Sequence, residues 1–187
     1  YYTYSDYLHP KVEGSFNGYL KNPITVHDVT NLNLQWLLDV VADSRGDIIG
    51  EAGALSLAHI STKNLLLMRQ ARENLEKILS IIIGKDVYFH LNFRSLYGAR
   101  FRIVQKENDN VICPTLDSLS TGQIALFNIF ATIIHYADNN DITKSIHLDE
   151  ITGIVVIDEI ELHLHSKLQK EVLPKLIAMF PKIQFII

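Results

Sequence analysis

Hydrophobic positions recur with a helical period in two long stretches of the chain. In residues 61–83 most apolar side chains fall on one face of a helix: Leu65, Leu66, Met68, Leu75, Ile78, Leu79 and Ile82. This spacing predicts an amphipathic helix. Ser61 and Thr62 can cap its start, and Gly84 supplies its C-terminal stop. Residues 124–137 predict a second amphipathic helix.

Shorter apolar runs, separated by turn residues, predict strands. Three are expected in the middle of the chain: Val87–Leu91, Ala99–Val104 and Val111–Cys113. Glu107–Asn110 supplies the turn of a hairpin between the last two. The other predicted elements are a short helix at Asn31–Ala42, a helix at His165–Phe180 closed by Pro181, and a strand at Ile183–Ile187. Tyr1–Asp28 lacks a helical period and predicts a loop or edge structure.

Residues 154–159, Ile-Val-Val-Ile-Asp-Glu, combine four β-branched residues with two carboxylates. This pattern predicts a buried central strand with acid groups at its C-terminal end, which is where ligands bind in open α/β sheets. Asp158 suits a Mg²⁺ shell, because Mg²⁺ prefers oxygen ligands and often takes only one or two carboxylates. Glu159 can position or deprotonate a water that attacks a phosphoryl group. Taken alone, the same run could be a plain strand end.

A second motif, Leu-Ser-Thr-Gly-Gln at residues 119–123, precedes the amphipathic stretch 124–137. Ser120 and Thr121 are good N-cap residues. Gly122 lets a phosphate approach the backbone, and a helix N-terminus offers unpaired N–H groups to an anion. By itself this segment could be an ordinary capped helix start. The acidic strand that follows it in the chain favours the phosphate interpretation.

The two motifs resemble those of a known family. Leu119–Gln123 is similar to the signature loop of ABC-type ATPases. Gly153–His165 resembles the Walker B and D-loop region of bacterial ABC-like ATPases, a group that includes RecF/SMC-like proteins, the OLD proteins and the ATPases of Septu and retron anti-phage systems. Its Leu-His-Leu-His sequence is most similar to the defence-associated branch. In residues 1–110 the resemblance lies only in the general layout.

The resemblance implies an α/β fold: an ABC-ATPase-like head with a central, mainly parallel sheet, flanking helices and a helical and hairpin insertion. It implies ATP and Mg²⁺ as cofactors, with Asp158 holding Mg²⁺ through water and Glu159 as the catalytic glutamate. Ser120 and Gly122 would contact the γ-phosphate of a nucleotide that a second subunit holds.

The same resemblance places three further residues beside the nucleotide. Thr121 and Gln123 belong to the signature loop, and His163 lies in the D-loop, which packs across a dimer interface. His163 and His165 with Glu161 also suggest a metal site, but two histidines without a further Cys or His are weak evidence for zinc. A D-loop role is therefore the preferred interpretation.

The chain departs from the family pattern in three respects. Thr121 replaces the more usual glycine of transporter signatures, and Ser166 stands where these proteins usually have proline. The phosphate-loop motif G-x-x-x-x-G-K-[ST] does not occur, since the glycine cluster at Gly46–Gly53 has neither the lysine nor the hydroxyl group. We therefore expect a C-terminal part of the head that lacks Walker A. A degenerate ATPase is the alternative.

The predicted elements and motifs divide the chain into three regions: a loop-rich insertion at 1–60, a basic helix and hairpin at 61–113, and the signature helix with Walker B at 114–187. Residues 61–106 hold nine basic and three acidic residues, a balance of +6, although the whole chain has a net charge of −4. A basic middle fits contact with DNA. A solvated helix face would give the same composition.

Composition indicates the number of domains and the cellular location to expect. With 187 residues and 48% hydrophobic residues, one domain with a sizeable core is expected. Cys113 is the single cysteine, which predicts no disulfide and a cytoplasmic location. The longest apolar stretch, Ile124–Ile134, contains Asn128 and Thr132 and is too short to span a bilayer, so no membrane partner is expected.

The leading hypothesis is an ATPase subunit that forms a homodimer or higher oligomer through ATP-sandwiched heads. Its cycle would control an effector protein, such as a nuclease or toxin, in phage defence. The first alternative is a RecF/SMC-like ATPase that clamps DNA during repair. The second is a scaffold that keeps the head fold without turnover.

Overall fold

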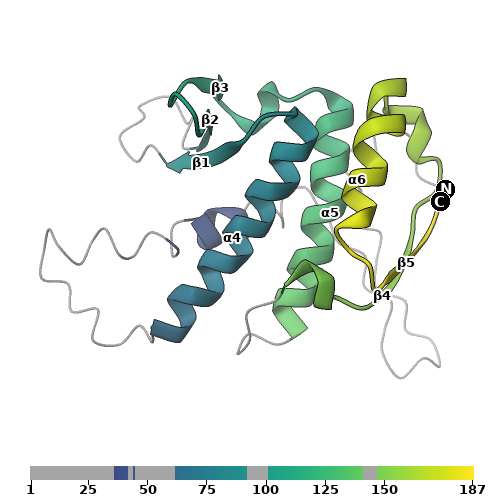
Figure 1. Cartoon of the computed structure of the whole chain (residues 1–187), viewed down its shortest axis with the longest axis horizontal. Helices are drawn as coiled ribbons and strands as arrows, with labels where there is room; N and C mark the ends of the chain where they lie inside the picture. The colour runs from purple at the N-terminus through teal and green to yellow at the C-terminus, as the bar shows by residue number, and fades with distance from the viewer. Residues whose placement is uncertain (1–35, 42–43, 45–61, 92–100, 141–146) are drawn as a thin grey trace, which may run out of the picture.

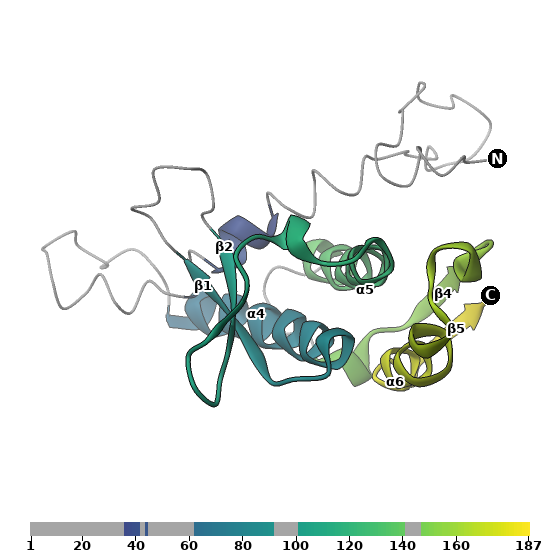
Figure 2. The same cartoon turned by 90° about the horizontal axis from the view of Figure 1, so that it is seen from above.

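The computed structural model describes residues 36–41, 44, 62–91, 101–140 and 147–187. Three predictions lie outside these residues: the loop at Tyr1–Asp28, the glycine cluster at Gly46–Gly53 and the Ser61 cap. The described part has two sheets on opposite sides of a central group of helices (Figures 1 and 2).

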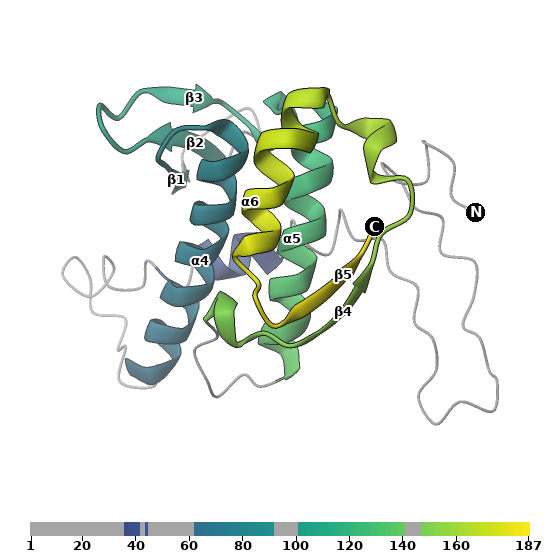
Figure 3. The same ribbon diagram turned by 45° about the vertical axis from the view of Figure 1, so that its right-hand side comes forward.

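Two long helices form the centre of the core. Helix α4 spans Thr62–Ile83 and helix α5 spans Thr121–Asn140, and they pack side by side (Figures 1 and 3). Their buried apolar residues recur three or four positions apart: Leu75, Ile78, Leu79 and Ile82 on α4, and Leu126, Phe127, Phe130 and Ile134 on α5. Both predicted amphipathic helices are confirmed. The predicted helix at Asn31–Ala42 is helical over its described residues 36–41.

The first sheet is antiparallel, with strand order β1-β2-β3. Its strands are β1 at Val87–Leu91, β2 at Phe101–Gln105 and β3 at Val111–Cys113. Phe89 pairs with Ile103 across β1 and β2. Both side chains are fully buried, and the Phe89 ring meets Phe127 of α5 at 6.3 Å. The predicted strands and hairpin are confirmed, with β2 ending one residue later than expected.

The outer edge of β1 is closed by side chains of α4. The N–H of Val87 donates to Ser80 Oγ at 3.0 Å, and the N–H of Phe89 donates to Glu76 Oε1 at 3.2 Å. Helix α4 then ends at Gly84, whose φ of 77° is left-handed, and the N–H groups of Gly84 and Lys85 both donate to the Ser80 carbonyl. The edge N–H groups of Val87 and Phe89 are thus satisfied within the chain, which protects this part of the strand from adventitious pairing.

The second sheet is a parallel pair, β4 at Gly153–Val156 and β5 at Ile183–Ile186. The chain between them forms a 3₁₀ turn, η4, at Ile160–His163 and a helix that begins at Ser166. The ring of Phe130 on α5 lies 6.0 Å from Phe185 on β5, so one face of this sheet packs against the central helices. This parallel pair with flanking helices confirms the predicted α/β class.

The burial predicted for residues 154–157 is wrong for the described structure. Ile154 is 67% exposed and Val156 is 70% exposed, and Ile186 on β5 is 49% exposed. Within the described residues β4 pairs with β5 alone, and no other layer covers their outer face. An apolar run in the sequence cannot tell whether one or both faces of a strand are covered.

The helix after η4 contains a π-turn that the sequence did not predict. It begins at Ser166, widens to a π-helix at Leu168–Val172 (η5) and continues as α6 at Leu173–Ala178. Pro174 has no N–H to donate to the preceding turn, so a local widening accommodates it. None of the described helices is long and apolar enough to cross a membrane.

Candidate functional site

The start of α5 is closed by a reciprocal capping box. The Ser120 N–H donates to Gln123 Oε1 at 3.0 Å, and the Gln123 N–H donates to Ser120 Oγ at 3.3 Å. The Ile124 N–H donates to the Ser120 carbonyl at 2.9 Å, which is the first helical bond. Ser120 is therefore the N-cap that the sequence predicted, and Gln123 is its partner three residues later. Buried Leu119 anchors the segment in the core.

This helix start keeps donors for an anion. The Ser120 hydroxyl accepts a bond from Gln123, so its own hydrogen remains able to donate. Ser120 and Thr121 are exposed, whereas Gly122 is buried. An anion at this position would therefore meet Ser120 and Thr121 first. The positive end of the α5 dipole adds a favourable field for negative charge.

Asp158 and Glu159 lie at the C-terminal end of the parallel pair, as predicted. The Ile157 N–H donates to the Ile186 carbonyl at 2.9 Å, which extends the ladder up to the two acids. Both carboxylates are exposed. Adjacent exposed carboxylates fit Mg²⁺, which binds few protein oxygens and keeps several waters.

The Glu159 backbone is left-handed, with φ 52° and ψ 37°. For a residue other than glycine this conformation costs about 1–2 kcal/mol relative to the right-handed one. Such residues persist only where their surroundings hold them, and they cluster at functional sites. Nothing in the sequence signals this conformation, because an Asp-Glu pair carries no glycine or asparagine.

The turn after Glu159 is anchored by apolar and polar contacts. Ile160 and Leu164 are buried. The amide of Gln169, from the π-turn, donates to the carbonyls of Glu161 at 3.1 Å and Leu164 at 2.8 Å. Gln169 was not among the predicted site residues. An amide side chain near the start of a helix is too common a feature to single it out.

The two motifs lie on the same side of the molecule (Figures 1 and 3). Turn η4 contacts α5 and lies toward the end where α5 begins (Figures 1 and 3). The backbone of His163 lies within η4, but its side chain is outside the described residues, and His165 is exposed. Over the described parts of the chain, no three His, Cys, Asp or Glu side chains gather as a metal site. The metal interpretation of His163, His165 and Glu161 includes a side chain outside the described residues, so it stays a prediction.

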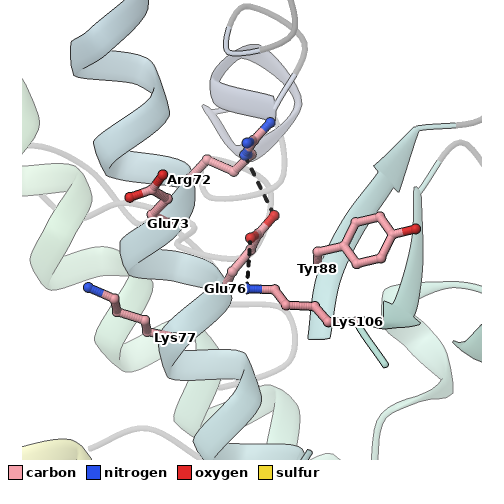
Figure 4. A pocket seen from close by; sticks show the side chains of 6 residues that line it. All are labelled: Arg72, Glu73, Glu76, Lys77, Tyr88 and Lys106. Carbon is pink, nitrogen blue, oxygen red and sulfur yellow. Dashed lines mark ion pairs between the residues drawn. The ribbon is translucent and has the colours of Figure 1, made fainter. Parts of the chain in front are cut away.

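Several cations of the basic middle region form ion pairs within the chain (Figure 4). Glu76, on the side of α4 that faces the hairpin, has a side chain that is only 8% exposed. Its carboxylate lies 3.6 Å from Arg72 Nε and 3.7 Å from Lys106 Nζ, beside a cavity of about 470 Å³. Arg69 pairs with Glu73 at 3.1 Å. Arg69 and Arg72 pair within α4, and Lys106, the residue after β2, pairs with Glu76 of α4. Because these cations balance carboxylates, they do not by themselves favour DNA contact.

Two remaining polar groups have structural roles. Burial raises the pKa of the Cys113 thiol, which disfavours the reactive thiolate. Burial also raises the pKa of Asp138, although the Trp36 indole N–H, bound at 3.2 Å, and His135 both lower it. The Trp36 and His135 rings stack at 4.7 Å. This cluster fastens the helical residues 36–41 to α5.

Sequence comparison shows the family. The family described as "AAA domain, putative AbiEii toxin, Type IV TA system" matches residues 42–187, and the chain belongs to it. Among curated proteins, the chain is similar to the Retron Ec83 probable ATPase of Escherichia coli, with 56% identity over 36 residues. It is also similar to the Retron Vc95 probable ATPase of Vibrio cholerae serotype O1 biovar El Tor, with 60% identity over 35 residues.

Each of these matches covers 19% of this chain and 7% of the relative. The matched stretch is therefore a small part of either retron protein. Together with the family match, it confirms the predicted resemblance to AAA/ABC-type ATPases related to anti-phage defence systems.

Proposed function

We propose that this chain is part of the head of a Mg²⁺-dependent ATPase that acts in anti-phage defence. The observation that carries the proposal is the position of Asp158 and Glu159, exposed at the C-terminal end of a parallel strand pair. The capped start of α5 lies on the same side of the molecule (Figures 1 and 3). Family membership and the two retron ATPases support the same class.

Each acid has one role in the proposed chemistry. Asp158 would hold Mg²⁺, and the bound ion would supply positive charge beside the phosphate oxygens. Glu159 orients the attacking water and accepts its proton. The Glu159 backbone is left-handed, and its side chain is exposed, so a water molecule can reach the carboxylate.

The signature loop acts on a nucleotide held by a second subunit. The Ser120 hydroxyl donates to the γ-phosphate while its oxygen still accepts the Gln123 N–H. Thr121 lies beside it, and Gly122 keeps the backbone free of a side chain. His163, in the D-loop, lies at the same dimer interface. ATP therefore joins two heads, and its hydrolysis separates them.

The head dimer controls an effector protein, a nuclease or a toxin. This part of the proposal rests on the similarity to retron ATPases rather than on a contact within the chain. A DNA-clamping role is the alternative. Co-purification with an effector and no shift of duplex DNA would favour defence, whereas ATP-dependent retention of DNA would favour the clamp.

The function is tested in the full-length protein that contains this chain. Glu159→Gln should keep ATP binding but lower turnover by roughly 10²–10⁴-fold, because the water loses its base. Glu171→Gln, at an exposed position on the following helix, is the matched control and should retain wild-type turnover. Undiminished turnover in Glu159→Gln would move the chemistry to another residue.

A second test uses residues 1–187 by themselves. They contain no phosphate-loop motif, so we expect no ATP turnover from this segment, whereas the full-length protein hydrolyses ATP. Mg²⁺-dependent turnover by the isolated segment, abolished in Glu159→Gln, would show that phosphate binding does not need that motif.

A further inference from the structure

One side-chain amide ties the turn after Glu159 to the following helix. Gln169 Nε2 donates to both the Glu161 carbonyl at 3.1 Å and the Leu164 carbonyl at 2.8 Å. The Glu161 carbonyl also accepts the Leu164 N–H at 3.2 Å. The Leu164 N–H thus closes the turn, and the Gln169 amide fastens the turn to the helix.

These bonds complete a pair of fixed points around Glu159. Two residues before it, the Ile157 N–H donates to the Ile186 carbonyl and holds the strand end in the ladder. Two residues after it, the Glu161 carbonyl is held by Gln169. A short segment fixed at both ends has little freedom. Glu159 would have to break one of these anchors to leave its left-handed conformation.

The π-turn brings Gln169 into reach of the turn. Leu168 and Val172, on either side of it, are buried and fix the helix against the core. The Gln169 N–H donates to the His165 carbonyl at 3.1 Å, which closes the first helical turn. The Gln169 side chain is half-buried. Both hydrogen bonds that its amide donates run to backbone carbonyls.

We propose that Gln169 is a positioning residue for Glu159. Its amide holds the turn at the carbonyls of Glu161 and Leu164. The turn then keeps the Glu159 backbone left-handed, and this backbone conformation sets the position of the Glu159 carboxylate. This inference rests on the proposed ATPase function. It adds a residue that acts on the catalytic step through the backbone, without contact to nucleotide.

The test measures steady-state ATP turnover in the full-length protein. Gln169→Met keeps the length of the side chain but removes both donor bonds. We expect kcat to fall about tenfold to a hundredfold, since small displacements of a catalytic group have effects of this size. KM for ATP should stay within about twofold of wild type. Lys170→Met, at an exposed neighbouring position, is the control and should behave like wild type.

Two further variants separate positioning from general damage. Gln169→Lys retains hydrogen-bond donors on a side chain of similar reach, so it should recover part of the lost kcat. If Gln169→Met does not fold, Gln169→Asn replaces it, because its shorter amide cannot reach both carbonyls. Hydrogen exchange should quicken in peptides that cover residues 159–165 and stay unchanged in those from α5.

The outcomes distinguish this inference from the function on which it rests. If Glu159→Gln loses turnover while a folded Gln169→Met keeps its kcat within about twofold, the positioning role is wrong and the ATPase assignment stands. A rise in KM at constant kcat would also overturn the positioning role. If Glu159→Gln retains turnover, the catalytic role of Glu159 is wrong and the role of Gln169 falls with it. If the wild-type full-length protein does not hydrolyse ATP, the proposed function itself fails.

Discussion

The two sheets differ in how completely the described chain covers their faces and pairs their edge N–H groups. The antiparallel sheet has its β1 edge closed by Ser80 and Glu76 of α4, and its inner face is packed on the helices. The parallel pair packs one face on α5 but exposes Ile154 and Val156 on the other. The closed edge and the packed face stabilise the first region. The second concentrates exposed acids and backbone strain, which are features of a working site.

Helix α5 belongs to both regions, and Phe130 is the sharpest test of whether they unfold together. Its ring is fully buried, stacks on Phe180 with ring centroids 5.6 Å apart, and contacts Phe185 in a tilted arrangement at 6.0 Å. Phe130→Ala should lower the free energy of unfolding by about 3–5 kcal/mol. Denaturant unfolding, followed by circular dichroism, measures the change.

The control for this substitution is Tyr136→Ala on the same helix, where the side chain is 53% exposed. It should change stability by less than about 1 kcal/mol. Two separate unfolding transitions in Phe130→Ala, one for each sheet, would show that the regions are independent.

Glu76 tests the closure of the antiparallel region. Glu76→Ala removes the acceptor of the Phe89 N–H and the partner of Arg72 and Lys106. We expect a loss of about 1–3 kcal/mol, less than for a fully buried pair, because Lys106 is 53% exposed. Glu73→Ala, which breaks the exposed pair with Arg69, should cost less than about 0.5 kcal/mol. Equal losses would mean that edge closure contributes little.

Two left-handed residues, one in each region, give the finest comparison. Glu159→Gly should raise the free energy of unfolding by up to about 1 kcal/mol, because glycine adopts this conformation without strain, and should abolish ATP turnover. Asp109→Gly in the hairpin should give no gain. Aspartate tolerates the left-handed region, and Asp109 accepts the Tyr88 hydroxyl at 3.0 Å.

Differential scanning calorimetry measures both changes. A gain at Asp109 that matches the gain at Glu159 would remove the argument that strain is concentrated beside the proposed catalytic residue. A Glu159→Gly protein with full turnover would separate the strain from the chemistry.

Local patterns were enough to predict most of the elements. The apolar period of residues 61–83 and the alternation of Val87–Leu91 give α4 and β1 because a helix face and a strand face each bury their own repeating positions. Gly84 predicts the helix end for a reason that is also local: its φ of 77° is left-handed, and glycine adopts this conformation without steric cost. The Ser120–Gln123 capping box also lies within four residues of sequence.

What the sequence could not give are the features that join distant segments. The closure of β1 by Glu76 spans 13 residues, and the exposure of Val156 depends on which layers meet the sheet. The left-handed turn at Glu159 lies between the bond from the Ile157 N–H to the Ile186 carbonyl and the bonds that Gln169 donates to Glu161 and Leu164. The sequence determined which residues repeat on a face and which chemistry follows a strand. Only the tertiary structure decided which faces are covered and what holds the acids in place, because these depend on contacts between segments that have no local pattern in common.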